Sequence, residues 1–238
     1  MLQRRTTQTN ELVVSYLVLR KLVGWIGMLL PFVLMVGNAV MSETRPDSMS
    51  GYYYTPMRNI FVGSLCALGV FLIAYDGYDN VDRWITNIAG LCAIGVAFCP
   101  TKPSGPMATW QNDVGDIHVV FAICTFTALG LMALRFAKGG QTPDGQNKLG
   151  QVRHGLGFAA TPARTAPTIE IVAYRVCGLL ILACVVLAAL SNFLPSSDFA
   201  SWPVLFILEA TAVVAFGVSW FVKGKTILPV RRRAARLP

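Results

Sequence analysis

Long runs of apolar residues, separated by more polar stretches, recur along the chain. A membrane-spanning α-helix needs about 17 to 25 apolar residues. Six runs approach this length, at residues 22–40, 59–75, 84–99, 117–136, 171–190 and 203–222, and the second and third are the shortest. The pattern predicts an all-α fold, a polytopic membrane bundle of six transmembrane helices.

Composition supports a membrane location. Of the 238 residues, 54% are hydrophobic and only 13% are charged, whereas soluble domains have about 25% charged residues. So few charged side chains cannot cover a soluble surface, and we expect one compact bundle. The six cysteines form no CxxC pair, so neither a disulfide framework nor a metal site of the zinc-finger type is expected.

Two residue patterns bear on helix packing. Ala89, Ala93 and Ala97 recur every fourth residue in the third run, which predicts a small-residue face that lets helices approach closely. Four of the five tryptophans lie near the ends of runs, as expected for an interfacial aromatic belt: Trp25, Trp84, Trp202 and Trp220.

The distribution of Lys and Arg predicts the orientation. With alternating helices, all but three of the basic residues that flank the runs fall on one side, and only Arg45, Arg58 and Lys102 fall on the other. The positive-inside rule then places both termini in the cytoplasm of a multi-pass protein of the bacterial inner membrane. Residues 1–21 are an N-terminal cytoplasmic segment, 22–222 the transmembrane domain with a mobile cytoplasmic loop at 137–170, and 223–238 a basic cytoplasmic tail.

The net charge of +8 does not indicate a nucleic-acid partner. The excess lies on one side of the membrane, where it sets the topology and attracts anionic lipid headgroups. No aromatic residues interleave with the basic tail to form a nucleic-acid surface. We therefore expect membrane lipids as partners, together with other membrane-protein subunits if the chain belongs to a complex.

Glu209 is an acidic residue inside the last apolar run, where a charge costs roughly 2.5 to 3.5 kcal/mol. Helical rise places it in the outer third of the membrane, together with polar residues from three other helices. The predicted cluster consists of Glu209, His118, Asp116, Arg58, Ser64 and Asn38. Two interpretations remain open. Glu209 either binds a cation or a ligand head group or relays a proton, or it has a structural role, as a pair with Arg58 or His118 or as a protonated acid that is hydrogen-bonded to a neighbouring helix.

No pattern of catalytic residues is found. The chain has two histidines on opposite sides of the predicted membrane, whereas a zinc hydrolase needs about three protein ligands. Ser64 lacks a GxSxG elbow, and no phosphate-binding glycine loop is present. We expect no catalytic residue, metal or cofactor. Two alternatives stay open: an intramembrane hydrolase or transferase that uses His118, Asp116 and Glu209, and an ion-coupled transporter.

A second polar group lies at the cytoplasmic end. Arg175 is inside the fifth apolar run, and Asp76 and Asp82 flank the turn between the second and third runs. Arg175 either snorkels to the headgroups or pairs with one of the two carboxylates. We expect the pair, as a lock between helices.

Four segments carry a resemblance to a known family: "SGYYYTPMRNIFVGSLCALGVFLIAYDGYD", "NIAGLCAIGVAFCPT", "DIHVVFAICTF" and "FILEATAVVAFGVSWFVKG". With them the chain resembles the small six-span bacterial membrane proteins grouped as domain of unknown function 998. The resemblance implies a six-span helical bundle and no reaction. It implies recurrent polar positions at Arg58, Asp76, His118, Arg175, Glu209 and Lys223. The expected function is the non-enzymatic binding of a lipid, an amphiphile or partner helices, which would suit an accessory subunit of a membrane complex.

Overall fold

The computed structural model describes the backbone of residues 2–42, 44–75, 77, 79–103, 108–139, 168–191 and 203–226, and side chains within these ranges except at 2–17, 139, 168, 225 and 226. This part of the chain contains α-helices, one 3-10 helix and no strand. The elements are α1 (Leu2–Met41), η1 (Ser50–Tyr54), α2 (Arg58–Ile73), α3 (Asn80–Phe98), α4 (Thr109–Gly139), α6 (Thr168–Ser191) and α7 (Val204–Thr226). The expected all-α fold is confirmed.

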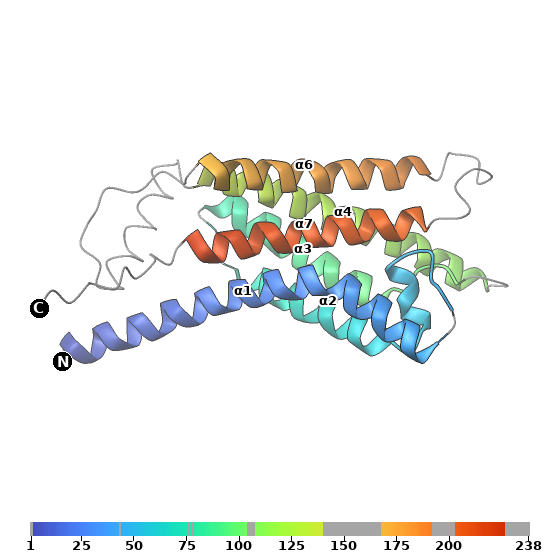
Figure 1. Ribbon diagram of the computed structural model, residues 1–238, viewed down its shortest axis with the longest axis horizontal. Coiled ribbons are helices and arrows are strands. Elements are labelled where there is room, and N and C mark those ends of the chain that lie inside the picture. Colours follow the sequence, from blue (N-terminus) through green and yellow to red (C-terminus); the bar gives the residue numbers. More distant parts are fainter. Residues whose placement is uncertain are drawn as a thin grey trace, which may run out of the picture.

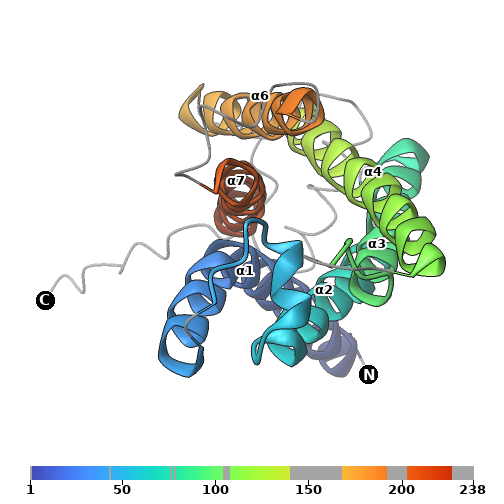
Figure 2. The ribbon, with the colours of Figure 1, turned by 90° about the vertical axis from the view of Figure 1, so that its right-hand side faces the viewer.

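The helices form a closed ring in which successive helices run in opposite directions (Figures 1 and 2). Each helix packs against the next along the chain, and α7 closes the ring by packing along α1. The contact between α1 and α2 is the least extensive of the six. We call the end where α1 begins and α7 ends the termini end, and the opposite end, where η1 lies, the loop end.

In the described part of the chain, five helical segments are long and apolar enough to cross a membrane: Val18–Met41, Asn80–Phe98, Thr109–Lys138, Ile169–Ser191 and Val204–Gly224. Helix α2 is apolar but has only 16 residues, a length of about 24 Å. The surface of the bundle is apolar, with Phe32, Leu91 and Leu179 all exposed. The chain is therefore a multi-pass membrane protein.

Some predicted segments extend differently from the expectation, and others lie outside the described residues. Helix α1 begins at Leu2, so the expected N-terminal segment 1–21 is continuous with the first span and extends beyond the bundle (Figure 1). The expected mobile loop 137–170 is described only at its edges, where α4 continues to Gly139 and α6 begins at Thr168. The basic tail 223–238 is described only as far as residue 226.

Glycines let three pairs of helices approach closely. A Cβ atom added at any of these positions would lie within about 3 Å of the neighbouring helix. The pairs are Gly24 and Gly217 between α1 and α7, Gly69 and Gly90 between α2 and α3, and Gly130 and Gly178 between α4 and α6. Lipid is as apolar as a leucine side chain, so helix association in membranes depends on such close packing.

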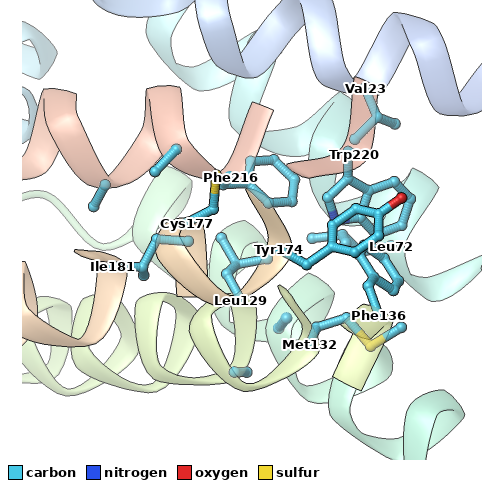
Figure 3. Packing of buried hydrophobic residues seen from close by; sticks show 14 of the residues in the cluster. Val23, Leu72, Leu129, Met132, Phe136, Tyr174, Cys177, Ile181, Phe216 and Trp220 are labelled. Atoms are coloured by element: carbon cyan, nitrogen blue, oxygen red, sulfur yellow. The ribbon is translucent and has the colours of Figure 1, made fainter. Parts of the chain in front are cut away.

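The helices enclose an aromatic core near the termini end (Figure 3). Trp220 of α7 is 2% exposed, and its ring centre lies 4.9 Å from Tyr75 and 5.6 Å from Phe136. Tyr174 of α6 extends this cluster, since its ring centre lies 5.7 Å from that of Phe136. The rings meet at steep angles, the edge-to-face geometry that aromatic pairs favour.

The two packing predictions differ in outcome. The alanine face is confirmed, because Ala89, Ala93 and Ala97 are all buried. The aromatic-belt interpretation is wrong for Trp220, which lies in the core, whereas Trp25 and Trp84 are exposed. Trp202 lies outside the described residues. Trp220 lies near the end of α7, but the helix turns it toward the middle of the ring.

Candidate functional site

Glu209 lies in the second turn of α7, near the loop end. Its Oε2 atom accepts a hydrogen bond of 2.6 Å from the backbone N–H of Met49. Met49 is the N-cap of η1, and helix geometry leaves backbone N–H groups at such a terminus without partners. The carboxylate supplies that partner from a helix far away in sequence.

The roof segment, residues 44–57 with η1 at its centre, is joined to the bundle on several sides. The N–H of Phe206 donates to the carbonyl of Asp47 at 3.0 Å, and the Phe206 ring centre lies 5.9 Å from that of Tyr52. The Tyr54 hydroxyl donates to the carbonyl of Thr101 at 2.7 Å. Together with Glu209, these contacts tie the roof segment to α7 and to the connection between α3 and α4.

A cavity of about 50 Å³ lies beneath the roof segment. A water molecule needs roughly 10 to 15 Å³ on this measure, so there is room for several water-sized groups. Its walls come from α1, α2, α3, α4 and α7, and they are almost wholly apolar. The polar exceptions are Ser50, Thr125 and Glu209. Among the described lining residues, Glu209 alone is ionisable.

Glu209 is half-buried. Its Oε2 atom points to the roof segment, and the residue lines the cavity. Within the described residues, Glu209 forms no ion pair. The hypothesis of a pair with Arg58 or His118 is therefore not what the structure shows: the backbone amide of Met49 takes that place.

Four of the other five residues of the predicted cluster contact partners outside it. Nδ1 of His118, which is buried, lies 2.5 Å from the carbonyl oxygen of Cys99. This bond ties α4 to the end of α3. Asp116 is exposed and forms an ion pair of 2.7 Å with Lys102. Both contacts join α4 to the chain that precedes it.

Arg58 is exposed, and its guanidinium lies 4.2 Å from the ring centre of Tyr53 and donates to that hydroxyl. Asn38 is buried and donates to the carbonyl of Thr44 at 2.6 Å. Ser64 is half-buried in α2. In the described part of the chain, no hydrogen bond or ion pair joins any two of the six cluster residues.

The termini end contains a buried ion pair. Asp82 of α3 is 2% exposed at its side chain and accepts from Nε of Arg135 in α4. Nη2 of the same arginine lies 2.6 Å from the carboxylate of Asp79. The expected pair of Arg175 with Asp82 does not form among the described residues: the cation that Asp82 meets is Arg135. Arg175 is exposed beside the apolar face of α6, as in the snorkelling alternative, and Asp76 lies outside the described residues.

Sequence reasoning missed two buried cations. Arg20 of α1 is 5% exposed and donates from Nη2 to the Tyr75 hydroxyl at 2.7 Å. Lys223 of α7 is 4% exposed, and its Nζ lies 5.0 Å from the ring centre of Phe136 and 5.5 Å from that of Tyr174. Both residues adjoin apolar runs, where basic flanking residues are expected. The family resemblance marks Lys223 as a recurrent polar position, but nothing in the sequence indicates that either side chain is buried.

The contacts of Asp79 predict that the folded protein loses stability at acidic pH. It is the N-cap of α3, where its carboxylate accepts from the N–H of Asp82 at 2.8 Å. Burial raises the pKa of Asp79, but the Asp82 amide and the charge of Arg135 outweigh it and hold the pKa below the usual 3.8. A carboxylate whose pKa is lower in the folded state stabilises the fold above its unfolded pKa. This contribution is lost as the pH falls from there through the folded pKa.

We expect Asp79→Asn to reduce the loss of stability below about pH 4, because asparagine keeps the cap but carries no charge. Asp79→Ala should in addition cost about 1 kcal/mol at neutral pH, through loss of the cap. Thermal unfolding in detergent, followed from pH 7 to about pH 3, measures both effects. Parallel pH profiles of Asp79→Asn and the wild type would contradict the assignment.

No protein-family model matches the chain, and no curated protein and no solved structure is significantly similar to it. Among the described residues, no group of three His, Cys, Asp or Glu side chains is placed to hold a metal ion. The cavity beneath the roof segment, with its single carboxylate, is therefore the candidate functional site.

Proposed function

We propose that the chain is a six-span protein of the bacterial inner membrane that binds a lipid or another amphiphile, one part of which occupies the cavity beneath the roof segment, and that it catalyses no reaction. The observation that carries the proposal is the cavity itself: an apolar space between the helices with one carboxylate in its wall. Ligand sites commonly combine apolar walls with a few convergent polar groups. An amphiphile has the matching chemistry.

The proposal takes α2 as the sixth span. Its 16 residues are short for a bilayer core about 30 Å thick, but α2 packs along α3, and short spans are accommodated by local thinning. Six spans return the chain to its starting side, which agrees with both ends of the described chain lying at the termini end (Figure 1). The excess of Lys and Arg at that end supports its assignment to the cytoplasm. The resemblance to the domain of unknown function 998 family supports the same count.

Filling the cavity tests the proposal. Ala122 of α4 lines the cavity, whereas Val120 of the same helix is 60% exposed. We expect the wild-type protein, purified in a mild detergent, to retain about one amphiphile per chain by native mass spectrometry. Ala122→Phe should lose it, because the ring occupies the space, and Val120→Phe should keep it.

Wild-type protein without a bound amphiphile, or an Ala122→Phe variant that keeps the wild-type amount, would overturn the proposal. Size-exclusion chromatography of both variants shows whether the fold is intact. The occupancy of the wild type does not depend on how either variant behaves, so the proposal stays falsifiable if Ala122→Phe fails to fold.

Ion-coupled transport is the second candidate, and the arrangement of α7 favours it. This helix carries Glu209 at the loop end and buried Lys223 at the termini end, and the cavity adjoins α7 between them. Transport sites lie near mid-membrane, and intramembrane ionisable residues often mark ion pathways. Flux in proteoliposomes that persists in Glu209→Gln would exclude this role. The separate partners of His118, Asp116 and Glu209 do not support a hydrolase or transferase.

A further inference from the structure

We infer that the ligand of the cavity carries a positively charged ammonium group, which the Glu209 carboxylate receives while the apolar part lies against the phenyl rings of the wall. This inference rests on the proposed function and adds the chemical class of the ligand. Three features of the cavity carry it: the missing counter-charge, the free acceptor capacity of Glu209 and the aromatic lining.

The first feature is the missing counter-charge. Glu209 is the one ionisable group among the described residues that line the cavity, and no described residue forms an ion pair with it. Two cations at the loop end are engaged elsewhere, Arg58 with the Tyr53 ring and Lys102 with Asp116. A buried carboxylate without a cation is costly. A bound ammonium would offset that cost.

The second feature is the free acceptor capacity of the carboxylate. The N–H of Met49 donates to Oε2 of Glu209 at 2.6 Å. Hydrogen bonds donated to a carboxylate favour its charged form. A carboxylate has roughly four acceptor sites on its two oxygens, so the Met49 amide leaves room for a further donor from the cavity. An ammonium group is such a donor and also supplies the opposite charge.

The third feature is the aromatic lining. Phe61 of α2, Phe126 of α4 and Phe216 of α7 contribute rings to the wall, and cations are attracted to ring faces within about 6 Å. The same chain already uses this contact at the termini end, where Nζ of Lys223 lies 5.0 Å from the Phe136 ring centre.

Other ligand classes fit less well. An anionic head would face the Glu209 carboxylate, and like charges repel strongly in an apolar site. A bare metal cation needs several oxygen ligands, and the lining offers side-chain oxygens only from Glu209, Ser50 and Thr125. The Thr125 hydroxyl already donates to the carbonyl of Phe121 at 2.8 Å. A ligand with a neutral head group would leave the Glu209 carboxylate without a counter-ion.

Three ligands of equal chain length test the inference: hexylammonium, 1-hexanol and hexanoate. Calorimetric titration of the protein in lipid nanodiscs, corrected with empty discs, measures each affinity at neutral pH. We expect hexylammonium to bind at least tenfold more tightly than hexanol, and hexanoate to bind most weakly. Glu209→Gln, which keeps an acceptor for the Met49 N–H, should remove the preference for hexylammonium and leave hexanol binding unchanged. Phe126→Leu should weaken the binding of hexylammonium severalfold and the binding of hexanol less.

The outcomes separate the two proposals. Saturable hexanol binding that Ala122→Phe abolishes, with no advantage for hexylammonium, would overturn the cation inference and keep the amphiphile site. A hexylammonium preference that survives in Glu209→Gln would also overturn the inference. Saturable heat from sodium chloride alone, lost in Glu209→Gln, would assign the carboxylate to a metal cation instead. No saturable binding of any ligand, and no effect of Ala122→Phe, would overturn the proposed function itself.

Discussion

Replacing Arg135 by glutamine is expected to lower the free energy of unfolding by about 3 kcal/mol. Removing one partner of a buried ion pair costs about 3–5 kcal/mol, because the remaining charge is left without compensation. Here that charge is Asp82, whose side chain is only 2% exposed. We expect the lower end of the range because the Arg135 side chain is 32% exposed. Reversible unfolding in mixed detergent micelles measures the difference.

Two variants make the Arg135 prediction specific. The double variant Asp82→Asn/Arg135→Gln should be more stable than Arg135→Gln alone, because no buried carboxylate remains uncompensated. Arg175→Gln removes an exposed arginine, and surface substitutions of this kind change stability by about 0.5 kcal/mol or less. Equal stabilities of the single and double variants would show that the Asp82 carboxylate does not depend on Arg135.

Gly217→Ala is expected to destabilise the protein by about 1–3 kcal/mol, the usual cost of overpacking a close contact. A Cβ atom at this position would lie 2.6 Å from the backbone nitrogen of Met28 and 2.7 Å from the carbonyl oxygen of Gly24. Backbone atoms cannot move aside as a side chain can, so α1 and α7 must separate. The loss should appear as a lower unfolding temperature in detergent.

Gly63→Ala is the matched control for Gly217→Ala. Gly63 also lies within a helix, but a Cβ atom there meets nothing within 4 Å. Alanine has the better helix propensity, so this variant should be as stable as the wild type or slightly more so. If both substitutions shifted the unfolding temperature alike, the close approach of α1 and α7 would not be the cause.

Most helices could be predicted from the sequence, because an apolar run as long as a bilayer core is thick rarely forms anything but a membrane-spanning helix. The burial of Ala89, Ala93 and Ala97 also followed from spacing alone, since every fourth residue shares a helix face. Boundaries were harder: α1 starts at Leu2, where polar residues gave no hydropathy signal. The sequence also does not show whether a given side chain on a helix faces the core or the lipid. For this reason the burial of Trp220 was not predicted.

Partners of polar residues were the least predictable feature. Glu209 was recognised as unusual, but it accepts from an amide that is 160 residues away, and backbone donors leave no mark in a sequence. Asp82 and Arg135 were both visible, but choosing between Arg135 and Arg175 required knowing which face of each helix points inward. The cavity is defined by five helices together, so no single segment predicts it.

The close contact between α1 and α7 has a consequence for biosynthesis. Gly24 of α1 meets Gly217 of α7, yet nearly all of the described chain lies between them. During translation α1 therefore enters the bilayer long before its neighbour exists, and its glycine face must be covered in the meantime by lipid or by the insertion machinery. The backbone N–H of Met49 likewise lacks its acceptor until α7 brings Glu209. The compartment under η1 is therefore completed only when α7 emerges and docks.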